Sequence, residues 1–216
     1  IPSDISPYVP EYVGNQIANN FSMTFDGVDD YFNAGNDSSL NIIGSLSVSA
    51  WFKTLNNTSS IMIVTKDDGA SNRAWQLYMI STGSIRFAIN GVTAFATSSG
   101  VYDDGNWHHV LALYEPSNYV KLYIDGVADG EDTTSVPASI NNLPSQDVVI
   151  GAYSVYDGGT RWNGQIDEVA IFNYALNAGQ IYNDIYLPTK SGTGLTANLD
   201  NNPNLTAPVA WYRMGD

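Results

Sequence analysis

The fold of this 216-residue chain is restricted most by one recurring feature: short segments in which apolar and polar residues alternate, joined by Asx-Gly turns. In residues 45–54 (SLSVSAWFKT) every second residue is apolar, which is the period of a β-strand with one buried face. Asn90-Gly91 and Asp125-Gly126 each separate two such segments, and these dipeptides favour hairpins because the tight turn needs two positive φ angles. The pattern predicts packed antiparallel sheets rather than a parallel α/β core.

One short helix is expected, at residues 177–185, where apolar residues recur at helical spacing. Asn177 is a candidate N-cap, and Pro188 is expected to end the helix soon afterwards. In the segment 45–54, the side that carries Ser47 and Ser49 is expected to be partly exposed. Further strands are expected at residues 21–25, 31–34, 61–65, 75–80, 85–89, 92–97, 110–114, 120–124, 127–128, 148–151, 165–173 and 209–213.

The length and composition of the chain exclude several classes of protein and site. All-β sandwiches of about 200 to 250 residues are commonly single domains, so one domain is expected. The chain has no cysteine, which excludes a disulfide framework and a thiolate zinc site. It has no run of about 18 apolar residues that could span a membrane. Its formal net charge of −14 opposes the phosphate backbone, so nucleic acid is not an expected partner.

Eight motifs occur in an order that resembles the laminin G-like domains of the concanavalin A-like lectin/glucanase superfamily. The resemblance covers residues 21–186, and it implies an all-β, two-sheet antiparallel jelly-roll sandwich with one short helix near the C-terminus. The motifs are FDGVDDYF (25–32), SLSVSAWFKT (45–54), KDDG (66–69), GSIRFAING (83–91), DGNWHHVLALYE (104–115), KLYIDGV (121–127), VVIGAYS (148–154) and GQIDEVAIFNYAL (164–176).

The domain boundaries follow from the extent of this resemblance. Residues 1–20 are expected to form an irregular arm, and residues 21–187 the jelly roll. Residues 188–216 are a C-terminal extension. Family members commonly begin with a strand of the type Val-Ala-Tyr-Trp, which is missing before Phe21, but PVAWYRMGD (208–216) is similar to it. We expect a closing strand at 208–213 in the same sheet; the alternative is the first strand of a further module.

Two aspartates are candidate metal ligands. Calcium binds six to eight hard oxygen atoms, and Asp26 and Asp167 each stand at the edge of an expected strand. The resemblance implies that they meet around one structural Ca²⁺; the alternative is that each only shapes its own turn or strand end. Asp29 and Asp30 are interpreted as solvated turn residues. His108 and His109 are consecutive in a strand, so their rings point to opposite faces and we expect a structural role for them.

Catalysis is not favoured. Glycosidases of this fold use carboxylates that alternate along one strand, whereas Asp167 and Glu168 are consecutive and are expected to face apart. The sequence contains no Glu-x-Asp-x-x-Glu pattern and no arrangement typical of a Ser-His-Asp triad.

Ligand binding is the favoured activity, because two polar loops combine aromatic faces with planar polar groups, the chemistry of a sugar site. Trp162 has an alternative role in the core. The candidate residues are Asp67, Asp68, Asn72, Arg73, Trp75, Tyr153, Tyr156, Asp157, Arg161 and Trp162.

The sequence therefore predicts a non-catalytic recognition module for glycans or glycoconjugates, with a structural Ca²⁺. The alternative is an assembly or decoration domain that contacts a partner protein, and a glycan-active enzyme is a minor alternative. From the resemblance we expect an extracellular, cell-surface or virion location, and a place in a larger multidomain chain.

Overall fold

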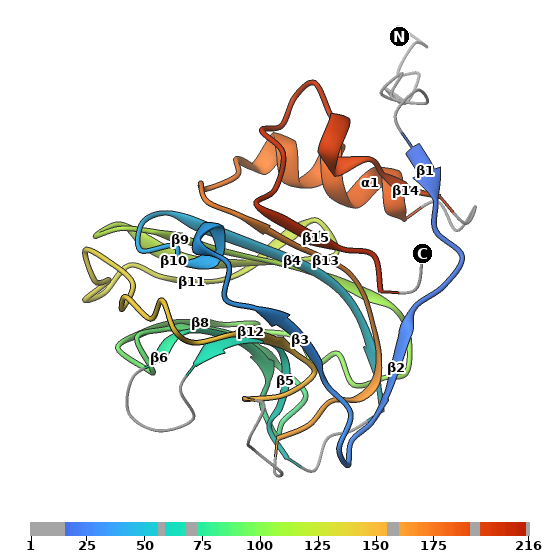
Figure 1. Cartoon of the computed structure of the whole chain (residues 1–216), viewed down its shortest axis with the longest axis horizontal. Helices are drawn as coiled ribbons and strands as arrows, with labels where there is room; N and C mark the ends of the chain where they lie inside the picture. Colours follow the sequence, from blue (N-terminus) through green and yellow to red (C-terminus); the bar gives the residue numbers. More distant parts are fainter. Residues whose placement is uncertain (1–15, 56–58, 68–72, 155–159, 191–194, 215–216) are drawn as a thin grey trace, which may run out of the picture.

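Two antiparallel sheets pack face to face (Figure 1), in a computed structural model that describes residues 16–55, 59–67, 73–154, 160–190 and 195–214. In the described residues, the seven-stranded sheet has the order β11-β10-β9-β4-β13-β15, and β2 also pairs with β13; the six-stranded sheet has the order β3-β12-β5-β6-β7-β8. This arrangement confirms the predicted sandwich. The strands are β2 (Met23–Asp26), β3 (Phe32–Gly35), β4 (Leu46–Thr54), β5 (Ile61–Asp67), β6 (Arg73–Met79), β7 (Ile85–Ile89), β8 (Ala94–Thr97), β9 (His108–Glu115), β10 (Tyr119–Ile124), β11 (Val127–Asp132), β12 (Val148–Ile150), β13 (Asn163–Phe172) and β15 (Ala210–Tyr212).

Asp125-Gly126 forms the predicted two-residue turn, whereas Asn90-Gly91 begins a connection of four residues, 90–93, between the paired residues Ile89 and Ala94. Asn90 and Gly91, between β7 and β8, have φ angles of 52° and 80°; Asp125 and Gly126, between β10 and β11, have 51° and 77°. Positive φ at both positions matches the right-handed twist of the flanking strands, so these turns fix which strands are neighbours.

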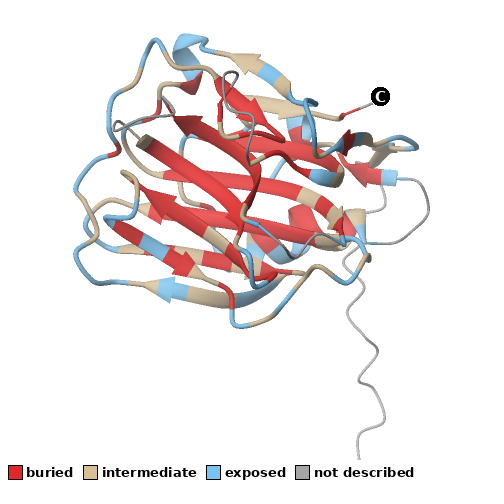
Figure 2. Ribbon diagram, turned by 90° about the horizontal axis from the view of Figure 1, so that it is seen from below, coloured by how far each residue is buried: buried red, intermediate tan, exposed pale blue. Residues whose placement is uncertain are grey.

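The main core lies between the sheets, where Figure 2 shows the buried strand segments. Four apolar residues of β4, Leu46, Val48, Ala50 and Phe52, are fully buried, and Phe87 of β7 belongs to the same cluster. Burying each large apolar side chain contributes about 1.5–3 kcal/mol relative to leaving it in water. The alternation in the sequence therefore gives the correct inner face of β4.

The other face of β4 is also buried, contrary to the expectation of partial exposure. Ser47 and Ser49 are 0% and 2% exposed. The Ser47 hydroxyl donates to the Tyr174 carbonyl at 2.6 Å, so this hydroxyl is hydrogen-bonded although it is buried. A second apolar cluster covers this face, and it includes Leu111, Phe172, Leu176, Ile181 and Ile185.

A helical segment from Ala178 to Thr189 provides part of this cover; it contains the π-helical η2 (Gln180–Tyr186) and α1 (Leu187–Thr189). Asn177 caps it as predicted, because its side chain accepts from the Gln180 amide at 3.0 Å. The prediction that Pro188 stops the helix was wrong. Pro188 cannot donate to the carbonyl four residues earlier, and that carbonyl, of Asp184, accepts from the Asn202 side chain at 3.5 Å instead. No helix in the described part of the chain has the length and apolar character to cross a membrane.

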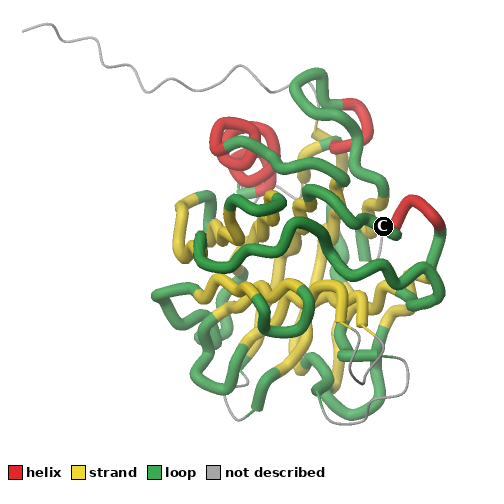
Figure 3. The backbone as a smooth tube through the Cα atoms, turned by 90° about the vertical axis from the view of Figure 1, so that its left-hand side faces the viewer, coloured by secondary structure: helices red, strands yellow, loops and turns green. Residues whose placement is uncertain are grey.

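The segments on either side of the expected jelly roll pack onto it. β1 (Gln16–Ala18) pairs with β14 (Leu195–Ala197), and this small sheet lies beside the helix on the outer side of the seven-stranded sheet (Figures 1 and 3). The expected irregular arm at 1–20 therefore contains a strand, while residues 1–15 lie outside the described residues. In the C-terminal extension, a strand forms at Ala210–Tyr212, within the expected 208–213, and pairs with β13.

One edge of β13 is shared by two short strands. β2 pairs with residues 163–166, and β15 pairs with residues 169–171. Between them, the pairing of β13 with β4 has a bulge after Asp167, where Glu168 and Val169 together lie opposite Ala50, and Glu168 has a positive φ of 51°. A bulge adds one unpaired residue and redirects side chains, so it changes which face each carboxylate occupies.

Candidate functional site

Three of the predicted ligand residues come together where β5 ends and β6 begins. The Oδ2 atom of Asp67 lies 3.8 Å from Nε of Arg73 and accepts a hydrogen bond from Nε2 of Gln76 at 2.9 Å. The Arg73 guanidinium lies 5.2 Å from the ring centre of Tyr153, in the segment after β12. We call Asp67, Arg73, Gln76 and Tyr153 the Asp67 cluster. Gln76 was not among the predicted residues, although it lies on the same face of β6 as Tyr78 and is 3% exposed.

The cluster offers four kinds of hydrogen-bonding group in contact with one another. Burial, with the Asp67 carboxylate adding to it, raises the pKa of Tyr153 to about 12, so its phenol is protonated near neutral pH. The Asp67 side chain is fully buried, whereas the Arg73 side chain is 36% exposed. A planar guanidinium held by a carboxylate and an aromatic face presents its remaining donors in a fixed direction.

The other predicted ligand residues are placed differently. Trp75 and Trp162 are fully buried in the main core, and Trp162 packs edge-on against Phe52, so neither can stack on a ligand. Arg161 is also buried, and its guanidinium lies 4.9 Å from the ring centre of Tyr31. Asp68, Asn72, Tyr156 and Asp157 lie outside the described residues.

The structure does not bring Asp26 and Asp167 together. Asp26 is paired with Asn163 in the register of β2 and β13, and Asp167 is four positions further along β13. Four strand positions separate backbone atoms by about 13 Å, at about 3.3 Å per residue. One calcium ion cannot be bound by both carboxylates in this arrangement, because ligand oxygens lie within about 2.6 Å of the ion.

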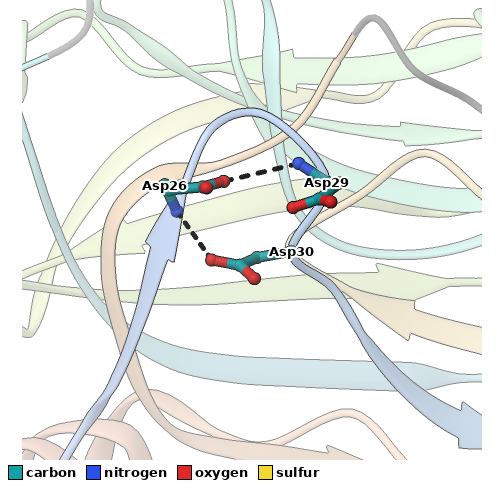
Figure 4. A group of neighbouring side chains, drawn as sticks. All are labelled: Asp26, Asp29 and Asp30. Atoms are coloured by element: carbon teal, nitrogen blue, oxygen red, sulfur yellow. Dashed lines mark hydrogen bonds between the residues drawn. The ribbon is translucent and has the colours of Figure 1, made fainter.

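Asp26 instead lies beside the two aspartates of its own turn (Figure 4). Asp26, Asp29 and Asp30 are exposed, and each can offer a carboxylate oxygen within 4.8 Å of the others. The Asp26 carboxylate accepts from the Val28 amide at 2.7 Å, which lowers its pKa, and the Asp26 amide donates to Asp30 at 3.0 Å. These three oxygen donors suit Ca²⁺, so the turn fits the ion better than the predicted pair does.

Asp167 and Glu168 face the same side of the sheet, which corrects the expectation that they face apart. Ile166 and Val169 both point into the main core, so the two carboxylates between them are on the outer face. Asp167 accepts from the side chain of Asn19 at 3.0 Å, and Glu168 accepts from the indole N–H of Trp211 at 2.8 Å. The bulge causes this departure from strict alternation.

Glu168 lies in a closed environment. It is 4% exposed, and burial, together with the charge of Asp167, raises its pKa to about 7. Nε of Arg213 lies 3.7 Å from its Oε1 atom. The neighbouring cavity, which His109 and Ser49 also line, has a volume of about 10 Å³, room for about one water molecule. A sugar cannot enter this cavity.

The two histidines occupy opposite faces, as predicted. His108 lies between carboxylates, with Nδ1 2.8 Å from Asp125 and Nε2 3.2 Å from Asp104, and chiefly the bond to Asp125 raises its pKa. His109 is fully buried, its Nε2 atom lies 2.8 Å from the Ser49 hydroxyl, and burial lowers its pKa to about 4. Its Nδ1 atom has no hydrogen-bond partner in the described part of the chain, so no acid orients the ring as a triad requires.

Comparison with known proteins agrees with this architecture. The sequence profile of the concanavalin A-like lectin/glucanases superfamily (Laminin_G_3) matches residues 26–182, well over half of the chain. The chain belongs to this superfamily. No curated protein matches the sequence.

Solved structures of the superfamily's fold include proteins named for carbohydrate binding. A proposed carbohydrate-binding protein from Bacteroides ovatus has a TM-score of 0.67 and 14% identity, over 92% of this chain and 53% of that one, so the chain spans about half of its length. The CBM40 of Ruminococcus gnavus IT-sialidase has a TM-score of 0.60 and 10% identity, over 77% and 96% of the two chains. A SAP-like pentraxin from Limulus polyphemus has a TM-score of 0.57 and 15% identity, over 78% and 80%.

The sequence analysis missed two residues that contact the predicted ones, Gln76 and Asn19. Gln76 carries no motif, and only its place opposite the core face of β6 suggests that it accompanies Asp67. Asn19 precedes the first recognised motif, and nothing in the sequence connects it to Asp167, from which 148 positions separate it. Gln76 is brought beside Asp67 by the pairing of β6 with β5, and Asn19 follows β1 directly.

Proposed function

We propose that this chain is a non-catalytic module that binds carbohydrate through the Asp67 cluster. The observation that carries the proposal is the contact of a carboxylate, a guanidinium, a carboxamide and a phenol ring where β5 ends and β6 begins. Sugar hydroxyls donate and accept hydrogen bonds, and such planar groups can bind two neighbouring hydroxyls at once. The partial exposure of Arg73 gives a ligand access to the cluster.

The comparisons support this proposal by analogy. Two of the similar structures are named as carbohydrate-binding or as CBM40 domains, and the CBM40 belongs to a sialidase. A fold does not determine function, so the argument depends on the Asp67 cluster itself. By the same analogy we propose an extracellular or cell-surface location and a place in a larger protein.

The geometry favours binding over catalysis. The only carboxylate here with a strongly raised pKa is Glu168 among the described residues, and it faces a cavity with room for about one water molecule. A general acid must reach the glycosidic oxygen of its substrate. Asp67 is held by Gln76 and Arg73.

A calcium ion at the turn formed by Asp26, Asp29 and Asp30 is the second part of the proposal. Three convergent carboxylate oxygens support it. Backbone carbonyls and water would complete the six to eight oxygens that Ca²⁺ requires. Bound there, the ion would offset the repulsion among three like charges in one turn.

A glycan array tests the carbohydrate proposal. Wild type is compared with Arg73→Ala and Gln76→Ala, and Arg86→Ala serves as a matched control because Arg86 also lies over an aromatic ring, that of Phe95. We expect the two cluster variants to lose most binding and Arg86→Ala to retain it. If wild type binds no glycan with or without Ca²⁺, the carbohydrate proposal fails and a role in assembly with a partner protein replaces it.

Thermal melting with Ca²⁺ and with a chelator tests the calcium proposal. A ligand of the folded state alone raises the melting temperature by mass action. We expect this rise in wild type and in the control Asp167→Asn, but not in a variant in which all three turn aspartates are asparagine. That variant carries Asp26→Asn, Asp29→Asn and Asp30→Asn. A melting temperature of wild type that does not respond to saturating Ca²⁺ would exclude the ion.

A further inference from the structure

An open groove lies on the outer side of the seven-stranded sheet, beside the end of α1. It consists of two adjoining hollows of about 230 and 370 Å³, which share Asn19, Trp107 and Asp167 as lining residues. The larger volume falls within the range of about 300–1,000 Å³ that is typical of small-molecule sites. The groove is separate from the Asp67 cluster, which belongs to the six-stranded sheet.

Aromatic side chains line the groove. Trp107 is 37% exposed and Phe21 is 63% exposed, so both present apolar surface to water. Trp51 is held in place, because its ring is stacked on Tyr186 at 6.0 Å and its indole N–H donates to the Thr189 hydroxyl at 3.2 Å. Rigid and exposed rings around one hollow are suited to stacking against a flat ligand face.

The floor of the groove carries acceptors for hydrogen bonds. Asp167 is 7% exposed; its Oδ1 accepts from the Glu168 amide at 2.8 Å, and its Oδ2 accepts from Nδ2 of Asn19 at 3.0 Å. That bond fixes the orientation of the Asn19 carboxamide, because its nitrogen must face the carboxylate. The Oδ1 atom of Asn19 is then a buried acceptor, and it has no hydrogen-bond partner in the described part of the chain. A buried acceptor without a donor indicates that a partner is missing.

The bulge in β13 builds this floor. Strict alternation would send one of the two consecutive carboxylates into the core, but the bulge turns both outward. It does so with a positive φ at Glu168, a conformation that costs about 1–3 kcal/mol for a non-glycine residue. Strain of this kind is concentrated at functional sites.

We propose that this groove binds a neutral pyranose sugar, as a second ligand site independent of the Asp67 cluster. The apolar face of the sugar stacks on Trp107, and its hydroxyls donate to Asp167 and Asn19. A carboxylate at the floor and a net charge of −14 oppose an anionic sugar, and Lys190 is the only cationic side chain among the described residues lining the groove. Two sites on opposite sheets would let one module bind two branches of a glycan surface, which raises avidity without new contacts.

Saturation-transfer NMR tests the proposal with the neutral sugars glucose, galactose, mannose, N-acetylglucosamine, lactose and cellobiose, and with sialyllactose as the anionic comparison. The variants are Trp107→Ala and Phe21→Ala, both at exposed positions. Phe95→Ala is the matched control, since Phe95 is 38% exposed and lies in β8 of the other sheet. We expect at least one neutral sugar to bind wild type, and its affinity to fall about tenfold in Trp107→Ala, which corresponds to about 1.4 kcal/mol. Phe95→Ala and Arg73→Ala should bind it as wild type does.

Three results would overturn the groove as a site. The first is that none of these sugars binds wild type, and the second is that only sialyllactose does. The third is that Trp107→Ala binds normally while Arg73→Ala loses binding, which would place the sugar at the Asp67 cluster and support that proposal instead. Circular dichroism of each variant shows that the fold is retained.

Discussion

Replacement of Glu168 by glutamine should remove most of a pH dependence of stability. Burial raises the pKa of Glu168 from 4.5 to about 7. Because the pKa is raised in the folded state, the folded protein binds a proton more tightly than the unfolded chain does. The stabilisation is complete below pH 4.5 and is lost as the pH rises through about 7.

The structure sets the size of this effect. Each tenfold change in proton affinity corresponds to about 1.4 kcal/mol, so the difference between pH 4.5 and pH 8 is about 3 kcal/mol. Glu168→Gln keeps the shape of the side chain and can still accept from Trp211, but it carries no charge to bury. The attraction of Arg213 acts on the charged form of Glu168 and lowers its pKa, so it is already included in the value of about 7.

Urea denaturation of both proteins at pH 5 and at pH 8 measures the effect. The free energy of unfolding of wild type should fall by about 2.5 kcal/mol more than that of Glu168→Gln between these pH values. In thermal melting, this corresponds to about 5–10 °C for a chain of this size. If the two proteins lose stability in parallel as the pH rises, the raised pKa of Glu168 is refuted.

Three further predictions concern other buried or paired groups. His108 has a raised pKa, so its contribution to stability is present below pH 6.5 and is lost as the pH rises through the folded-state pKa. Because the bond to Asp125 is the largest cause, an NMR titration of His108 should show a lower midpoint in Asp125→Asn than in wild type. Trp162→Ala should cost about 3–5 kcal/mol in urea denaturation because the ring is fully buried, and a loss below about 1 kcal/mol would contradict its place in the core. Gly164→Ala should destabilise the folded protein by more than about 1 kcal/mol, because the φ of Gly164 is +142° and a Cβ there would lie 2.1 Å from a backbone oxygen. In the control Gly44→Ala the added Cβ meets no atom within 4 Å, so the stability should change little.

Local patterns predicted the sandwich because they encode strand faces and turns directly. The inner face of β4 follows from its alternation, and the hairpins follow from Asn90-Gly91 and Asp125-Gly126, where positive φ is needed. The cap at Asn177 follows from its side chain in the same way. Each of these features depends on residues close together in the sequence.

The candidate sites, by contrast, depend on contacts between residues that lie far apart in the sequence. The register of β2 on β13 decides that Asp26 meets Asn163 rather than Asp167, and no local pattern contains that register. The alternation rule failed at Asp167 and Glu168 because a bulge adds a residue there. The helix continues through Pro188 to Thr189, and the Asp184 carbonyl accepts a hydrogen bond from a residue distant in sequence, Asn202.

The division of the β13 edge between β2 and β15 bears on how copies of this protein behave when crowded. An exposed edge strand offers a row of unpaired backbone groups to a strand of another molecule. Here the edge consists of pieces of only four and three residues, and β13 has its bulge, after Asp167, where the two pieces meet. An incoming strand would find no long, straight run of free amides and carbonyls, so this side of the sandwich is protected against sheet extension into aggregates.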